Sequence, residues 1–222
     1  MKVMKKEITY KEIPLFSNIK EMDLNQLFTC LRSYRQKYKR GENIIMEQDS
    51  VQYIGVVLSG MVHMLKDDIW GNQTLLGFME PGELIGESFA VRRTTESYVR
   101  FQAVKDSEII FLAASSIIHN CPRQCGFHAQ ITQNMFQLMG EKTVQLMEKI
   151  EVSSKASLRD KILAYLSLMS QKQNSRYIES PLTRTELAEY LCANRSAMTR
   201  ELAAMKEEGI LDYDKNTYNL KK

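Results

Sequence analysis

The sequence predicts an α+β protein in which a small β roll of the jelly-roll kind is followed by one long helix and by a helical C-terminal part that closes with a β hairpin. Short apolar runs between residues 39 and 113 are broken by Gly, Asp and Asn about every ten residues, the spacing of strands in a small barrel or sandwich. Residues 123–153 contain no Pro and have apolar side chains at heptad spacing, which indicates a long helix. Two capped segments and a hairpin signal occupy residues 183–220.

The composition is that of an ordinary globular protein. The chain has 222 residues, of which 44% are hydrophobic and 26% charged, and this excludes a disordered or collagen-like chain. The longest apolar stretches fall far short of the ~20 residues that a membrane span needs. The N-terminus lacks the apolar segment of a secretory signal, and four Cys do not make a disulfide scaffold. We therefore expect a cytoplasmic protein with reduced thiols and no membrane partner.

The net charge of +3 lies entirely in the last third of the chain. Residues 155–222 hold 12 Lys and Arg against 9 Asp and Glu, whereas the two signs balance in the rest of the sequence. This distribution is consistent with a nucleic-acid-binding C-terminal part, although a surplus of three is weak by itself.

The N-terminal half is predicted to change from helix to strands near residue 39. Residues 10–40 are expected to be helical, because apolar side chains recur there largely at steps of three and four. Turn residues such as Gly60 and the pair Pro81-Gly82 then separate short apolar runs. The predicted strands are residues 44–46, 53–58, 61–65, 74–79, 98–104 and 109–112.

The long helix over residues 123–153 is predicted to serve in dimerisation, because its apolar positions step by four and three as in a coiled coil. The predicted seam consists of Phe136, Met139, Thr143, Leu146 and Ile150. A second stripe at Ile131, Met135 and Leu138 can cover the β roll. The alternative is a single helix that lies on its own core, and the length of the helix favours the dimer.

A hinge is predicted near residue 154. The segment 152–156 is rich in small and polar residues, and Ser157 with Asp160 has the spacing of a capping box at the start of a new helix. These signals divide the chain into residues 1–122, 123–154 and 155–222.

The C-terminal residues show the pattern of a winged helix-turn-helix. Thr183 and Glu186 form an S/T-x-x-E cap for a first helix, and Asn194 can cap a second. Ala188 is small enough to let the two helices cross closely. The buried positions of the second helix are Met198, Leu202 and Met205, and the chain then reads as a hairpin that turns at residues 214–217. This is the most specific pattern in the sequence, because spacing, caps and small residue agree.

The second helix of this motif is predicted to read double-stranded DNA in the major groove. The side chains on its outer, N-terminal side are Arg195, Ser196, Thr199 and Arg200. Arg can form bidentate hydrogen bonds with guanine O6 and N7, so we expect base or phosphate contacts from both arginines. The alternative is that they are solvated surface charges. Thr183 and Arg184, at the start of the first helix, are predicted to contact phosphates.

These residues resemble the DNA-binding end of the cyclic-AMP receptor protein/FNR family of bacterial transcription regulators, and the resemblance covers almost the whole chain. Pro14–Phe16 resembles the family's first helix, Pro81–Glu87 its cyclic-nucleotide-binding-type β roll, and the long helix its dimerisation helix. The resemblance implies a sequence-specific transcription regulator, a homodimer on inverted-repeat DNA that contacts RNA polymerase under control of a small-molecule or redox signal. Ser196 stands where the family motif has a Glu that accepts from cytosine, so we expect a half-site other than the family's TGTGA.

The resemblance also places an effector pocket in the β roll. Gly86 and Glu87 match the start of the family's phosphate-binding cassette. Nucleotide-binding members follow this start with an Arg-Ser pair, whereas the ungapped count falls here on Ser97 and Tyr98, neither of which is cationic. Arg100 lies three residues past Ser97, so on a strand its side chain would point to the opposite face.

The helix side of the predicted pocket departs from the family as well. The polar pair that reaches adenine falls near Leu146 and Met147. Because burying a phosphate without a cation is costly, the sequence argues against cyclic AMP and leaves the effector unknown. Glu87 then has three open interpretations: a ligand contact, a structural acceptor or a relic.

A second sensing chemistry is suggested by a cluster of thiols and imidazoles, namely His119, Cys121, Cys125 and His128. The cluster could bind Zn²⁺, or its thiols could form a redox pair. Its spacing matches no strong metal motif, so we favour an ordinary helix start and predict no metal. An iron–sulfur site of the FNR type is rejected, since only Cys30 lies near the N-terminus. Cys30 and Cys192 are interpreted as buried packing residues.

An enzyme is not expected, because the sequence contains no nucleophile elbow, H-E-x-x-H, P-loop or G-x-G-x-x-G motif. The alternative to a regulator is a cyclic-nucleotide-type ligand-binding regulatory module of a signalling complex. The helix-turn-helix distinguishes the two, because only a regulator has DNA binding to lose when Arg195 and Arg200 are replaced.

Overall fold

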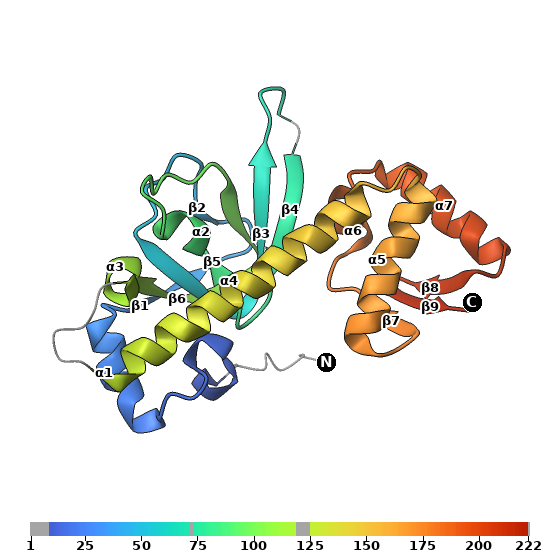
Figure 1. Cartoon of the computed structure of the whole chain (residues 1–222). Helices are drawn as coiled ribbons and strands as arrows, with labels where there is room; N and C mark the ends of the chain where they lie inside the picture. The colour runs from blue at the N-terminus through green and yellow to red at the C-terminus, as the bar shows by residue number, and fades with distance from the viewer. Residues whose placement is uncertain (1–8, 72, 119–124, 222) are drawn as a thin grey trace. The chain divides into compact units, whose positions relative to one another are not determined.

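The computed structural model describes residues 9–71, 73–118 and 125–221. The chain forms two compact units, residues 1–143 and 144–222, and one helix, α4 (Gly126–Ser153), runs from the first unit into the second (Figure 1). None of the helices in the described ranges is long and apolar enough to cross a membrane. The predicted fold class is confirmed: an α+β chain with a β roll, a long helix and a C-terminal winged helix-turn-helix.

The first unit is built around an antiparallel sheet of six described strands. The order is β1-β6-β3-β4, with β2 paired to β6 and β5 paired to β3. The two long strands β3 and β6 pair along most of their length, and their apolar side chains form the centre of the core. The strands are β1 (Tyr34–Tyr38), β2 (Asn43–Ile45), β3 (Tyr53–Asp67), β4 (Gln73–Met79), β5 (Leu84–Ile85) and β6 (Arg100–Ala113).

Two of the breaks predicted between strands, at residues 59–60 and 105–108, lie inside continuous strands. Residues 53–58 and 61–65 belong to the single strand β3, and residues 98–104 and 109–112 mostly to β6. Gly60 has φ +95° and lies where the β3–β6 register shifts, so it forms a bulge and not a hairpin. A Cβ at Gly60 would lie 2.6 Å from the carbonyl oxygen of Asp106, which explains the need for glycine.

The prediction of helix over residues 10–40 is wrong at its C-terminal end. The described helices are η1 (Tyr10–Glu12), η2 (Pro14–Phe16) and α1 (Glu21–Cys30), and β1 follows. β1 pairs with β6, and the ring of Tyr34 stacks on Phe111 with centroids 5.0 Å apart. Pairing with a strand more than sixty residues away therefore overrides the local helical pattern.

Helix α4 covers the β roll with the stripe expected from the sequence. Ile131 and Met135 are buried in the core of the first unit, and Leu138 packs against it. Asn134 fixes the helix further, because its amide donates to the carbonyl oxygens of Leu15 (2.9 Å) and Ser17 (2.8 Å). Two short helices not anticipated from the sequence complete the unit, α2 (Glu87–Ala90) and α3 (Ala114–Ile118).

The second unit contains three helices after α4 and a small sheet of order β7-β9-β8. The predicted caps are present: Ser157 Oγ accepts from the Asp160 amide, Thr183 forms a capping box with Glu186, and the Asn194 side chain accepts from the Ser196 amide. β7 was not anticipated. The elements are α5 (Leu158–Gln173), β7 (Tyr177–Glu179), α6 (Arg184–Tyr190), α7 (Arg195–Glu207), β8 (Leu211–Asp214) and β9 (Thr217–Leu220).

Candidate nucleic-acid interface and effector site

Helix α7 has one buried and one exposed face, as the sequence predicts. Met198, Leu202 and Met205 are fully buried on the inner face. The four predicted DNA contacts are all exposed on the outer face, in two rows with a spacing of four residues: Arg195 with Thr199, and Ser196 with Arg200. The structure thus brings the four side chains together at the N-terminal end of one helix.

The two arginines are the side chains of this group that remain available for a ligand. Thr199 Oγ1 donates to the carbonyl oxygen of Arg195 at 2.9 Å, and Ser196 Oγ donates to the capping oxygen of Asn194 at 2.6 Å. Within the described residues, neither Arg195 nor Arg200 makes a hydrogen bond or an ion pair through its guanidinium. Two uncompensated guanidinium groups at a helix N-terminus fit guanine edges or phosphates.

Arg159 on α5 holds α7 in place. Its Nε donates to Glu201 at 2.6 Å, and its two terminal nitrogens each donate to Glu208 at 2.8 Å. This two-bond contact keeps the pKa of Glu208 below its usual range. Arg159 therefore pairs with Glu201 of α7 and with Glu208, the residue that follows the helix, while Arg195 and Arg200 carry their positive charge at the other end.

Arg184, a predicted phosphate contact, is bound to the wing. Its guanidinium lies 4.3 Å from the ring centroid of Tyr213, and its Nε donates to the carbonyl oxygen of Lys215 at 3.1 Å. Thr183 is exposed beside it and caps α6. Arg184 therefore joins α6 to the β8–β9 turn and places its charge next to Lys215.

The predicted effector residue Glu87 has a cation partner that the sequence analysis missed. Glu87 begins α2 and is almost fully buried, and its Oε1 lies 3.3 Å from Nζ of Lys142 on α4. Lys142 Nζ also donates to the carbonyl oxygen of Leu84 at 2.8 Å. The other oxygen of Glu87, Oε2, is buried and accepts no hydrogen bond from the described residues. The sequence count, which found no cation at Ser97 and Tyr98, could not have found Lys142, because this lysine comes from a helix 55 residues away in the sequence.

The remaining predicted pocket residues are distributed differently. Gly86 precedes Glu87 at φ +75°. Ser97 is buried and donates to the carbonyl oxygen of Val99 at 2.7 Å, whereas Tyr98 is exposed. Arg100 is bound elsewhere, with its guanidinium donating to both carboxylate oxygens of Asp67 at 3.0–3.2 Å. Arg100 is therefore paired with Asp67 and not with Glu87. Ser97 lies outside β6, which begins at Arg100, so the expected opposite orientation of the two side chains on one strand stays a prediction.

Leu146 and Met147 belong to the second unit, so their assignment to the pocket stays a prediction. Both are exposed, as are three of the other positions of the predicted dimer seam, Phe136, Thr143 and Ile150. Met139 instead packs partly against the core of the first unit. Phe136 and Ile150 are 66% and 65% exposed, an unusual state for large apolar side chains that leaves the helix surface available to a partner.

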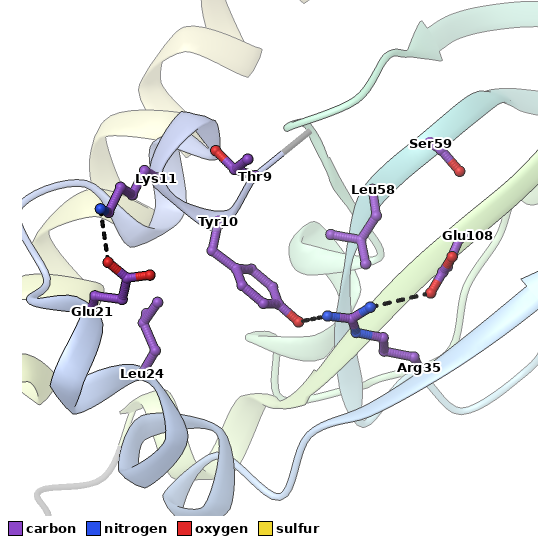
Figure 2. Close-up of a pocket in the computed structure, with 9 residues that line it drawn as sticks. All are labelled: Thr9, Tyr10, Lys11, Glu21, Leu24, Arg35, Leu58, Ser59 and Glu108. Carbon is purple, nitrogen blue, oxygen red and sulfur yellow. Dashed lines mark hydrogen bonds and ion pairs between the residues drawn. The ribbon is translucent and has the colours of Figure 1, made fainter. Parts of the chain in front are cut away.

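A separate hollow of about 430 Å³ lies between the N-terminal segment and the sheet (Figure 2). Arg35 donates to the hydroxyl of Tyr10 and, at 3.4 Å, to Glu108, while Lys11 pairs with Glu21 at 2.8 Å. The charges of these side chains are thus already neutralised by one another. The contacts around the hollow therefore attach η1 to β1 and β6, and the described charged side chains that line it are all paired with one another.

The cluster of thiols and imidazoles is only partly visible. His119 and Cys121 lie outside the described residues. Cys125 precedes α4 and accepts from Gln26 Nε2 at 3.8 Å, and partial burial lowers the pKa of His128. The interpretation of these four residues as an ordinary helix start without a metal stays a prediction. The interpretation of Cys30 and Cys192 as buried is wrong: Cys30 is half-buried and Cys192 is exposed.

A winged helix-turn-helix with two free arginines on its recognition helix, linked through a long helix to a β roll, defines a DNA-binding transcription regulator. Comparison with known families agrees. The family model described as "Cyclic nucleotide-binding domain" matches residues 35–123, and the model described as "Crp-like helix-turn-helix domain" matches residues 160–221. The chain belongs to the cyclic-AMP receptor protein/FNR family of bacterial transcription regulators.

Relatives cover most of the chain at low identity. The cyclic AMP receptor protein of Thermus thermophilus is 23% identical over 205 residues, which is 90% of this chain and 89% of that protein. The transcriptional activator FnrL of Cereibacter sphaeroides is 20% identical over 193 residues, 80% of this chain and 72% of that one.

Solved structures share the fold. The c-di-GMP-responsive regulator CLP of Xanthomonas campestris superposes with a TM-score of 0.72 at 16% identity, covering 91% of this chain and all of that one. FixK2 of Bradyrhizobium japonicum superposes with a TM-score of 0.67 at 16% identity, covering 86% and 93% of the two chains.

Proposed function

We propose that the protein acts as a homodimer that binds inverted-repeat DNA through α7 and changes its DNA affinity in response to a small-molecule or redox signal in the β roll. The observation on which this rests is the pair of exposed guanidinium groups of Arg195 and Arg200 on a braced helix. In this proposal the three parts of the chain divide the work: residues 1–122 sense, 123–154 dimerise and 155–222 bind DNA. No catalytic step is assigned to any of them.

The DNA half of the proposal needs two recognition helices about one duplex turn apart, ~34 Å, which a two-fold dimer provides. The exposed apolar side chains of α4 support dimerisation through that helix. Arg195 and Arg200 would read guanine edges or nearby phosphates, with Ser196 and Thr199 beside them, and Thr183 and Arg184 would contact phosphates. Transcriptional control through RNA polymerase, in the cytoplasm where the chromosome lies, completes the proposal.

The sensing half is supported by the contact between Glu87 and Lys142. Lys142 lies on α4, the helix that also presents the apolar seam, so a ligand that competes for either partner acts directly on that helix. Glu87 Oε2 offers an unused acceptor for a ligand hydroxyl or amine, and Lys142 offers a cation for a ligand anion. The effector we propose is thus a small polar molecule bearing both kinds of group.

The test is a selection of bound sequences from a random duplex pool, with reduced protein and no added effector. An inverted repeat with guanine-containing half-sites, lost in the Arg195→Ala/Arg200→Ala variant, supports the proposal. If no sequence is enriched, the selection is repeated with a metabolite extract. Enrichment only then means that a ligand is required, and no enrichment in either condition refutes DNA reading by α7. A protein that binds a ligand and a partner protein but no duplex would be the regulatory module of a signalling complex.

A further inference from the structure

A second hollow in the first unit, of about 420 Å³, is lined by aromatic rings. Its lining comes from β1, β2, residues 49–52, the start of β3 and β6. The rings are those of Tyr34, Tyr38, Tyr53 and Phe111, and we call the space between them the aromatic hollow. A space of this size accommodates a small organic molecule.

The rings of the aromatic hollow are inclined to one another. Tyr34 stacks on Phe111 with an interplanar angle of 19°, whereas Tyr53 meets Tyr34 at 74° with centroids 5.2 Å apart. Tyr38 meets Phe111 at 69°. Steeply inclined rings present their faces from more than one direction, which is the arrangement of the aromatic cages that bind methylated ammonium groups.

Tyr38 brings an unused hydroxyl to the aromatic hollow. Its side chain is only 9% exposed, and its hydroxyl makes no hydrogen bond with any described residue. Burial raises the pKa of Tyr38 to about 12, so the hydroxyl remains a neutral donor. A Phe would fill the same core position without a polar group that needs a partner, so the packing of the core does not explain this hydroxyl.

The charge of the described lining is negative. Asp49 is exposed at the hollow, and its Oδ2 accepts from the amide of Met46 at 2.7 Å, whereas its Oδ1 accepts no hydrogen bond from the described residues. The described lining residues include no Lys, Arg or His. Aromatic faces beside a carboxylate favour a cation with an apolar surface, and the absence of a cation among these residues disfavours a phosphate.

We propose that the aromatic hollow is a binding site for a small organic cation whose charge is covered by methyl groups, that is, a quaternary ammonium compound. The rings of Tyr34 and Tyr53 contact the methyl groups, Asp49 supplies the counter charge, and the Tyr38 hydroxyl donates to a polar end of the ligand. A primary ammonium is disfavoured, because aromatic rings do not replace the hydrogen bonds that it makes with water.

The aromatic hollow is separate from the contact between Glu87 and Lys142 but lies next to it. Neither of these two residues is among its described lining residues. Ile45 and Val51 do line the hollow, and a Cβ on Gly86 would lie 3.0 Å from a side-chain carbon of each. A ligand that displaces Ile45 or Val51 therefore acts on the residue before Glu87. Binding of the cation itself does not depend on the proposed DNA-binding role of α7.

The first part of the test measures the binding of choline to the full-length protein by isothermal titration calorimetry. The matched ligand is the uncharged analogue of choline in which a carbon atom replaces the nitrogen, so that shape is kept and charge is removed. We expect saturable binding of choline and at least about fivefold weaker binding of the uncharged analogue. Equal affinities for the two, or no saturable binding of choline up to about 10 mM, would overturn the proposal.

The second part locates the binding with variants whose Tm shows that they are folded. Tyr34→Leu should weaken choline binding at least about fivefold, whereas Tyr34→Phe keeps the ring and should retain the affinity. Asp49→Asn should weaken it about threefold, because the counter charge is lost. The control Tyr177→Leu removes an exposed ring from β7 in the second unit and should change nothing.

The proposal is overturned if folded Tyr34→Leu binds choline as tightly as the wild type, since the cation would then bind elsewhere. Should Tyr34→Leu fail to fold, Asp49→Asn decides in its place, because Asp49 is exposed and its replacement changes charge more than packing. An unchanged affinity in Asp49→Asn then has the same meaning. None of these results depends on whether the protein binds a duplex, so the proposed function is tested separately.

Discussion

Replacing Lys142 with Met isolates the contact between the β roll and helix α4. The substitution removes the cation from Glu87 Oε1 and the donor from the Leu84 carbonyl oxygen, while the methionine side chain keeps most of the volume of the lysine stem. The side chains of Lys142 and Glu87 are 16% and 3% exposed, so water cannot replace the lost partner at the carboxylate. The carboxylate is left buried without a cation, and the Ser88 hydroxyl at 3.3 Å remains as a donor to Oε1.

The expected cost is that of breaking a buried ion pair from one side. Such changes cost about 3–5 kcal/mol, and the partial exposure of Lys142 puts this one near 3 kcal/mol. At about 2–4 °C for each kcal/mol, the Tm of the first unit falls by about 6–12 °C. Glu87→Gln in the same protein removes the stranded charge and should restore much of the loss.

The assay is differential scanning calorimetry of the full chain at neutral pH, with Lys66→Met as the matched control. Lys66 has the same two kinds of partner, a carboxylate oxygen of Glu47 at 2.7 Å and the carbonyl oxygen of Tyr98 at 2.9 Å, but both charged side chains are substantially exposed. Exposed pairs contribute about 0–1 kcal/mol, so the control should shift the Tm by only a few degrees.

The reasoning is refuted if Lys142→Met lowers the Tm no more than Lys66→Met does. It is also refuted if adding Glu87→Gln to Lys142→Met brings no recovery, since the loss would then come from packing of the lysine stem and not from the charge left on Glu87. A large loss with recovery, together with a changed effector response, would link stability and signalling to the same pair.

Three further predictions concern the second unit and the dimer. Arg195→Ala and Arg200→Ala should each weaken specific DNA binding by about 1–3 kcal/mol, measured by fluorescence anisotropy at fixed salt. An unchanged affinity in either variant would mean that the replaced arginine does not contact the DNA. Because the pKa of Lys149 falls from 10.5 to about 8 on folding, the unfolded chain binds more protons between these values, so stability should rise with pH from about 8 to about 10.5. Urea titrations across this range should show the rise in the wild type and no rise in Lys149→Met, where the raised pKa values of Tyr38 and Tyr190 instead lower stability above about pH 10. A rise of equal size in both would point to another group. Phe136→Glu and Ile150→Glu should convert a dimer to monomers in sedimentation experiments without lowering the Tm, because both side chains are exposed within the chain.

Signals between near neighbours in the sequence were the most reliable guides to this fold. The capping pairs Ser157 with Asp160 and Thr183 with Glu186 act over three residues, and the structure has a helix start at each. The buried positions Met198, Leu202 and Met205 follow from helical spacing alone. The exposed position of the α7 arginines could be predicted in the same way, because the buried face of a helix determines which residues lie on its outer face.

Contacts between distant residues were not predicted. The residues of β1 were predicted to be helical, but they pair with β6 and form a strand. Gly60 was predicted to lie in a turn, but β3 continues through it. Counting along the sequence from Gly86 and Glu87 found no cation for the predicted pocket, because Lys142, which contacts Glu87, lies on α4. The exposure of Cys192 and the burial of Lys149 against the ring of Tyr190 could not be predicted from local patterns either.

By itself, therefore, the sequence determined the fold class, the starts of α5, α6 and α7, and the exposed face of α7 that we propose reads DNA, because these depend on propensity, capping and periodicity within a few residues. Only the tertiary structure decided which partner each of three cations meets: Lys142 contacts Glu87, Lys149 contacts the ring of Tyr190, and Arg159 contacts Glu201 of α7. Such pairs join elements far apart along the chain, and their energies arise from burial, which exists only after the chain has folded.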